Sequence, residues 1–262
     1  VYAVTVDTTP PAAPVIGSVT DNVAAYVGAI ANGGSANDTT PTVNGSGVSA
    51  GAVVSIFDGT TLLGTTTADG AGNWTFTTAP LTQGSHSLTA TVADAVGNAS
   101  APSAAYTVLI DTNAPAAPTI TSVTDDVALF TGTIASGGVT NDATPTIAGT
   151  TEPNASVSIY DNGVLLATVS ANGGGSWSYT PSGLLDGNHS FTVSATDAAG
   201  NVGPSSSAYA IVIDTIAPLP PTITGLTDDV SPVTGPVANG GTTHDTTPTL
   251  AGTAAANRTI SI

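Results

Sequence analysis

The sequence predicts an all-β protein made of repeated sandwich domains, on three observations. Apolar residues alternate with Thr or Ser along short segments, as at Leu88, Ala90 and Val92, which is the period of a strand with one buried face. Turn sequences rich in Gly, Asp and Asn separate these segments, in a chain with 30 Gly and 18 Pro. No segment has the period of a helix of useful length. Seven short strands in about a hundred residues fit an immunoglobulin-like fold, so we expect tandem immunoglobulin-like β-sandwich domains in a linear array.

The chain is an array of copies. The phrases DTTPPAAP, DTNAPAAP and DTIAPLPP begin at Asp7, Asp111 and Asp214, at spacings of 104 (111 − 7) and 103 (214 − 111) residues. We therefore expect the last strand of a preceding repeat at 1–6, complete repeats at 7–110 and 111–213, and the N-terminal part of a truncated repeat at 214–262. Both ends of the sequence then fall inside a repeat, which predicts a fragment of a longer protein.

Each strand of the first complete repeat is predicted from local alternation and from the turn that follows it. The DGT sequence separates the third strand from the fourth, ADGAGN separates the fourth from the fifth, and DAVGN follows the sixth. The expected strands lie near 14–19, 42–45, 52–57, 62–67, 74–78, 86–93 and 104–110. In this topology, the long connection 20–40 and the turn after the third strand lie at the pole where the last strand exits.

The acidic residues also repeat in register, and only one basic side chain, Arg258, exists to pair with them. Because the formal net charge is −17, neutralising the carboxylates requires a cation from outside the chain. Clustered Asp with Asn, Gly and Thr oxygens is the all-oxygen environment that calcium prefers, with about six to eight ligands. The predicted structural Ca²⁺ ligands are Asp7, Asp21, Asp38, Asp111, Asp125, Asp126, Asp142, Asp197, Asp214, Asp228, Asp229 and Asp245.

These acids are expected to gather at the junctions between repeats. At the first junction, Asp21, Asp38 and also Asp58 would approach the linker Asp111. The next repeat would contribute Asp197, Asn201 and also Glu152. At the second, Asp161 would join the corresponding acids around Asp214. The alternative is that Asp and Asn are ordinary turn residues here, since each DAVGN or DAAGN segment makes a good hairpin turn without a ligand.

Several classes of function are disfavoured. The negative charge would repel nucleic acid and anionic membrane surfaces, and the absence of Cys removes disulfides and thiolate chemistry. No apolar stretch is long enough to span a bilayer. His86 and His189 occupy the same place in two repeats but lie far along a strand from Asp94 and Asp197, so we expect no catalytic triad and no enzyme.

Most aromatic residues have a counterpart one repeat away, and we expect them to pack in the cores rather than to bind a ligand. His244 replaces the Asn of NDTTP and NDATP and is expected to fill a loop position. The aromatic pairs are Tyr26 with Phe130, Phe57 with Tyr160, Trp74 with Trp177, and Phe76 with Tyr179.

The linked segments DTxAPxAPTI, TDDV, TGxIxxGGxTNDxTPTIxGT, SIYDNG, GxWSYT and HSFTVSATDAAGNVGPSSSAYAIVIDT carry a family resemblance. The sequence resembles the bacterial Ig-like tandem repeats of giant type I-secreted, non-fimbrial adhesins and biofilm-associated proteins, of the SiiE, Bap and LapA kind. The resemblance covers the whole chain. It implies a stalk on a bacterial surface or outside the cell, stiffened by calcium at the domain junctions, with adhesive contacts to host-cell or biofilm-matrix glycans made mostly by other regions.

Two departures bear on metal binding. Asn22 replaces the second Asp of TDD in the first repeat, which removes one charge from that junction. Arg258 of the third repeat could offset carboxylates at the second junction. Two alternatives also stand beside the stalk: an Ig-like module that itself binds glycan or host protein, and accessory domains of a secreted hydrolase.

Overall fold

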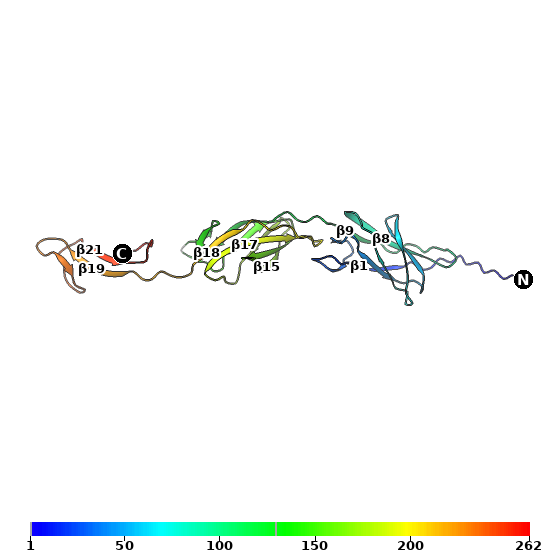
Figure 1. The fold of residues 1–262 in the computed structure, drawn as a ribbon, viewed down its shortest axis with the longest axis horizontal. Helices are drawn as coiled ribbons and strands as arrows, with labels where there is room; N and C mark the ends of the chain where they lie inside the picture. Colours follow the sequence, from blue (N-terminus) through cyan, green and yellow to red (C-terminus); the bar gives the residue numbers. More distant parts are fainter. Residues whose placement is uncertain (1, 129) are drawn as a thin grey trace. The chain divides into compact units, whose positions relative to one another are not determined.

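The computed structural model describes residues 2–128 and 130–262. Within these residues it contains twenty-one strands and no helix (Figure 1). The all-β prediction of tandem immunoglobulin-like sandwiches is therefore confirmed. No helix in the described part of the chain is long and apolar enough to cross a membrane.

Two sheets form the first sandwich. One has the order β2-β1-β4-β7 and is antiparallel throughout, and the other has the order β3-β9-β8-β5-β6, in which only the β3–β9 pair is parallel. The strands are β1 (Val15–Asp21), β2 (Gly28–Ile30), β3 (Gly34–Ala36), β4 (Thr42–Ser46), β5 (Val53–Asp58), β6 (Thr61–Thr67), β7 (Trp74–Thr77), β8 (Gly84–Ala93) and β9 (Tyr106–Ile110).

The second sandwich repeats this topology with the sheets β11-β10-β13-β16 and β12-β18-β17-β14-β15. Its strands are β10 (Thr119–Asp125), β11 (Gly132–Thr133), β12 (Gly138–Thr140), β13 (Thr146–Thr150), β14 (Ser156–Asp161), β15 (Val164–Ser170), β16 (Ser176–Tyr179), β17 (Gly187–Thr196) and β18 (Tyr209–Ile213).

The chain divides into two compact units, residues 1–214 and 215–262. The second unit contains one sheet of order β20-β19-β21, made by β19 (Thr222–Asp228), β20 (Gly235–Val237) and β21 (Thr249–Thr253). All residues of β21 are exposed, whereas the matching strand β13 buries Ile147 and Gly149. The third repeat therefore presents its inner face without the second sheet that buries it in the complete repeats.

Alternating residues of both sheets form the core of each sandwich. Val19, Val43, Ile56, Leu88 and Val108 are almost fully buried in the first. Burying one such side chain contributes roughly 1.5–3 kcal/mol, so the repeated alternation supplies most of the driving force for folding.

Each core also contains one tryptophan that packs on a glycine of the neighbouring strand. Trp74 faces Gly45, and Trp177 faces Gly149. A Cβ atom added at either glycine would overlap the indole and a backbone carbonyl oxygen. Glycine is therefore required sterically at these two strand positions.

The predicted strands all exist, but the connection 20–40 is more regular than expected. It contains β2 and β3, which pair with β1 and with β9 respectively. The aromatic prediction is confirmed for Trp74 and Trp177, which are buried. It is wrong for Tyr26 and Phe130, which lie in loops after β1 and β10 and are exposed, because no sheet covers those loops.

Candidate metal and junction site

A pair of buried carboxylates closes the connection between β1 and β4 in the first repeat. Asp21 ends β1, and Asp38 lies just before the Thr-Pro sequence that leads into β4; their exposed fractions are 5% and 1%. Asp21 Oδ1 accepts a hydrogen bond from the Val23 amide at 2.7 Å. Asp38 Oδ1 accepts from the amide and hydroxyl of Thr40 at 2.7 and 3.0 Å. Asp38 Oδ2 accepts from the Asn22 amide at 3.1 Å, so the two carboxylates tie the start and the end of the connection together.

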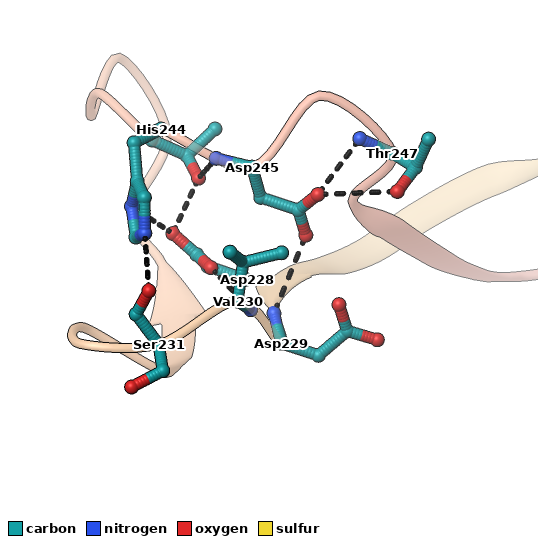
Figure 2. Close-up of polar contacts among 8 residues, drawn as sticks. Asp228, Asp229, Val230, Ser231, His244, Asp245 and Thr247 are labelled. Atoms are coloured by element: carbon teal, nitrogen blue, oxygen red, sulfur yellow. Dashed lines mark hydrogen bonds and ion pairs between the residues drawn. The ribbon is translucent and has the colours of Figure 1, made fainter.

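The same arrangement recurs in the other repeats with one additional donor. Thr140 Oγ1 donates to Asp125 Oδ2 at 2.5 Å and accepts from the Asp142 amide at 3.0 Å. In the third repeat, Figure 2 shows the corresponding network around Asp228 and Asp245. There the hydroxyl of Thr243 donates to Asp228 Oδ2 and accepts from the Asp245 amide. This hydroxyl links the two carboxylate positions of a pair directly.

The first repeat lacks this hydroxyl, because Ala36 occupies the position of Thr140 and Thr243. Burial raises the pKa of Asp21, and the nearby charge of Asp38 adds to that effect despite hydrogen bonds from backbone amides. The hydrogen bond from Thr243 instead lowers the pKa of Asp228, with a smaller contribution from the charge of His244. The first pair therefore lacks a hydrogen-bond donor that the other two pairs have.

His244 lies on the third pair, as Figure 2 shows. Its Nδ1 is 3.3 Å from Asp228 Oδ2, and its Nε2 is 3.3 Å from the carbonyl oxygen of Ser231. The expected loop position is therefore occupied by a side chain that contacts a predicted metal ligand. Asp229, which follows Asp228, donates its amide to Asp245 Oδ2 at 3.3 Å.

The linker aspartates contact the turn that follows the sixth predicted strand. Asn201 Nδ2 donates to the carbonyl oxygen of Asp111 at 2.8 Å and to Asp197 Oδ2 at 2.8 Å. Asn98 makes the same two contacts, with the Asp7 carbonyl at 3.1 Å and with Asp94 at 2.7 Å. Asn98 and Asn201 therefore fix these two linkers to the repeats that follow them. The predicted approach of Asn201 to Asp111 is confirmed, and its partner is the backbone carbonyl oxygen of Asp111.

The linker that begins at Asp111 also contacts the repeat that precedes it. Gln83 Nε2 donates to Asp111 Oδ1 at 2.8 Å, and Gln83 Oε1 accepts from the Thr112 amide at 3.0 Å. The Asp111 amide donates to the Ala36 carbonyl at 2.9 Å, as the Asp214 amide does to Thr140. Asp111 thus contacts both neighbouring repeats through atoms other than a shared ion.

Within the described residues, no group of three or more His, Cys, Asp or Glu side chains lies close enough to hold a metal ion. The structure brings six of the twelve predicted ligands together as pairs, which are Asp21 with Asp38, Asp125 with Asp142, and Asp228 with Asp245. Their oxygen atoms suit calcium chemically, and each carboxylate oxygen that accepts one hydrogen bond keeps a second lone pair. The hydrogen bonds within each pair are also those of ordinary Asp turns, so the turn alternative has direct structural support.

Asp58 and Asp161 do not join the junction, contrary to expectation, because each binds a histidine. His86 Nδ1 lies 2.7 Å from Asp58 Oδ2, and His86 Nε2 lies 2.7 Å from the Thr82 carbonyl oxygen. His189 makes the equivalent contacts with Asp161 at 2.7 Å and with the Leu185 carbonyl at 2.8 Å. Both ring nitrogens face acceptors, and both can donate only in the imidazolium form.

Burial by itself lowers the pKa of His86, but the hydrogen bonds to Asp58 and to the Thr82 carbonyl, with the charge of Asp58, outweigh it and raise the pKa. The pKa of His189 is raised in the same way. The other titratable side chain on a strand adjacent to His86 is Tyr106, whose hydroxyl donates to a backbone carbonyl. The sequence signal for this pair was the Asp and His separated by 28 residues in both repeats.

A family model described as the bacterial Ig-like domain matches residues 16–112 and 116–215. The matches cover most of the chain, and the chain belongs to this family. The described sandwiches and the repeat spacing agree with that assignment. No curated protein matches the sequence.

Several solved structures are similar to this chain in fold. Fibronectin(III)-like modules of Clostridium thermocellum CbhA are 18% identical, with a TM-score of 0.40, over 68% of this chain and 87% of that one. The BSP domain of a biofilm-associated protein is 18% identical, with a TM-score of 0.29, over 70% of this chain and 29% of that one. A tetra-tandem repeat in the extending region of a large adhesion protein is 20% identical, with a TM-score of 0.30, over 84% of this chain and 61% of that one.

Proposed function

We propose that this chain is a spacer segment of a large bacterial adhesin on the cell surface or outside the cell. Tandem bacterial Ig-like domains are established by the family match. The observation that carries the proposal is the reuse of one set of junction contacts, in which Asn98 and Asn201 fix the linkers at Asp7 and Asp111. A module repeated with its linker contacts is suited to extension by nearest-neighbour interfaces.

In this proposal the segment has no catalytic step, and its partners are neighbouring Ig-like repeats of the same chain. Binding to host-cell or biofilm-matrix glycans belongs to other regions of the parent protein. The negative charge supports the exclusion of nucleic acid and anionic membranes as partners, because one Arg is present against eighteen acidic residues.

We further propose calcium as the structural ion at the junctions. The paired carboxylates of Asp21 and Asp38 would supply ligand oxygens at the first junction, and those of Asp125 and Asp142 would do so at the second. The ion would neutralise clustered charge that the chain cannot balance itself. The support is the oxygen-only donor chemistry and the register of the acids.

Small-angle scattering and calorimetric titration of the full chain would test this proposal. We expect millimolar calcium, and not magnesium, to give heat and a longer, narrower distribution of dimensions than excess chelator. Asp38→Asn should weaken calcium binding by about tenfold or more through loss of a ligand charge. Asp69→Asn is the matched control, since Asp69 stands outside the repeated register and is exposed. Identical curves with calcium and chelator would contradict the calcium proposal.

A further inference from the structure

Two loops far apart in the sequence meet at the first junction. The amide of Asn37, in the connection between β3 and β4, donates to the carbonyl oxygen of Ala199 at 3.1 Å. Ala199 and Gly200 lie in the turn after β17. Gly200 lies against Tyr26, since a Cβ added to Gly200 would be 3.1 Å from Tyr26 Cδ2 and 3.3 Å from the Tyr26 amide nitrogen. The loop after β1 in one repeat thus contacts the turn after β17 in the next.

A comparison with the equivalent residues of other repeats shows how far this contact lowers the exposed fractions of Ala199 and Tyr26. Ala199 is 2% exposed, whereas Val96 at the same place in the first repeat is 65% exposed. Tyr26 is 48% exposed, whereas Phe130 at the same place in the second repeat is 81% exposed. Since the repeats have the same fold, the differences arise from the contact between the loop and the turn.

The atoms in this contact require no ion. They are a backbone amide, a backbone carbonyl, an aromatic ring and a glycine Cα, and none is a carboxylate. Gly200 has φ of +95°, and Gly97 in the first repeat has φ of +96°, so this turn needs glycine in every repeat for its own conformation. Gly200 has a second reason to be glycine, because a Cβ there would lie 3.1 Å from Tyr26 Cδ2. A Cβ on Gly97 would have no atom within 4 Å.

We propose that Tyr26 and the turn containing Ala199 and Gly200 form a metal-independent latch, in which the loop after β1 is a docking surface for the corresponding turn of the next repeat. The inference rests on the proposed spacer function, because it specifies how one repeat orients the next. Domains joined only by a linker move relative to each other by default. A short linker also gives a high effective concentration, so a small contact is enough to be populated.

The latch can be tested in the full chain with excess chelator, which removes any contribution from calcium. The chain has no Cys, so Thr67→Cys and Ser170→Cys introduce one spin label at an equivalent exposed strand position of each repeat. The distance distribution between labels is then measured by pulsed electron paramagnetic resonance. We expect a narrow distribution for this parent, and one about twofold wider or more for Tyr26→Ala, because a released linker samples many orientations.

Two further variants make the test specific. Phe130→Ala is the matched control, since it truncates the same loop where it is exposed, and it should leave the distribution unchanged. Ala199→Val gives the turn the sequence DAVGN that the first repeat already contains, so the turn still folds while the added methyl groups obstruct docking. This variant should widen the distribution as Tyr26→Ala does, and unchanged thermal unfolding would show that the sandwiches remain folded.

A parent distribution in chelator as wide as that of Tyr26→Ala would overturn the latch, as would equal effects of Tyr26→Ala and Phe130→Ala. The same samples measured with calcium address the spacer proposal separately. Narrowing by calcium in every variant would support metal stiffening even where the latch had failed. The distance distribution of the parent could instead be narrow, widened by Tyr26→Ala and unchanged by calcium. That result would support the latch and contradict the proposal that calcium stiffens the junction.

Discussion

Replacing Thr140 by Ala should destabilise the second repeat by removing the hydroxyl that links its two buried carboxylates. That hydroxyl donates to Asp125 and accepts from the amide of Asp142, and Thr140 itself is buried. In the variant, the carboxylate of Asp125 and the amide of Asp142 remain in place but lose the hydroxyl between them. The second repeat would then have the arrangement of the first, in which Ala36 stands at this position.

The size of the effect follows from the two bonds that are lost. A hydrogen bond to a charged group contributes about 1.5–3 kcal/mol, and a buried amide without an acceptor loses about 1–3 kcal/mol. Relaxation and access of water to the exposed side of the loop offset part of this loss. We expect the free energy of unfolding of the second repeat to fall by about 2 kcal/mol, which lowers its urea midpoint by roughly 1 M.

Tryptophan fluorescence can follow this repeat alone, because each complete repeat has one tryptophan. In a Trp74→Phe background, Trp177 reports only the second repeat during urea unfolding, with chelator present so that metal binding does not contribute. Thr168→Ala is the matched control, since it removes a hydroxyl from an exposed position of β15. Equal midpoints for Thr140→Ala and Thr168→Ala would refute the assignment of this hydroxyl as a stabilising link.

Two other predictions concern the core and its histidines. The folded pKa of His86 lies above its ordinary value of 6.5, so stabilisation by its charged form is complete below about pH 6.5 and is lost as pH rises through the folded pKa. The urea midpoint of the parent should therefore fall as the pH rises through the folded pKa of His86. The midpoint of His86→Gln should fall less over the same pH range, because Gln keeps a polar group beside Asp58 but does not titrate. Parallel plots of midpoint against pH for the two proteins would contradict this prediction. Gly149→Ala should lower the free energy of unfolding of the second repeat by roughly 3 kcal/mol, because the added methyl group overlaps Trp177. Gly173→Ala is the control and should change this free energy little, since a Cβ there meets no atom within 4 Å. Equal urea midpoints for the two variants would show that the indole tolerates the methyl group.

Much of the fold could be predicted from the sequence because its signals are local. Alternation at Leu88, Ala90 and Val92 identifies β8 without knowledge of its partners, since one face of a strand in a sandwich must be apolar. The repeated acids could be placed near the junction for a related reason. Asp21 and Asp38 flank a long connection, and the topology of a seven-stranded sandwich brings its two ends together.

Local sequence patterns therefore specify the repeat, the class of fold and the register of the acids, whereas long-range packing specifies which side chains contact one another. The short strands β2 and β3 lack alternation of their own, and they exist because β1 and β9 supply the hydrogen-bond partners. Asp58 turns inward to His86 across adjacent strands, and Tyr26 faces the next repeat instead of a core. Contacts of this kind join residues distant in the chain, so their free energy depends on the folded geometry and leaves little trace in local sequence.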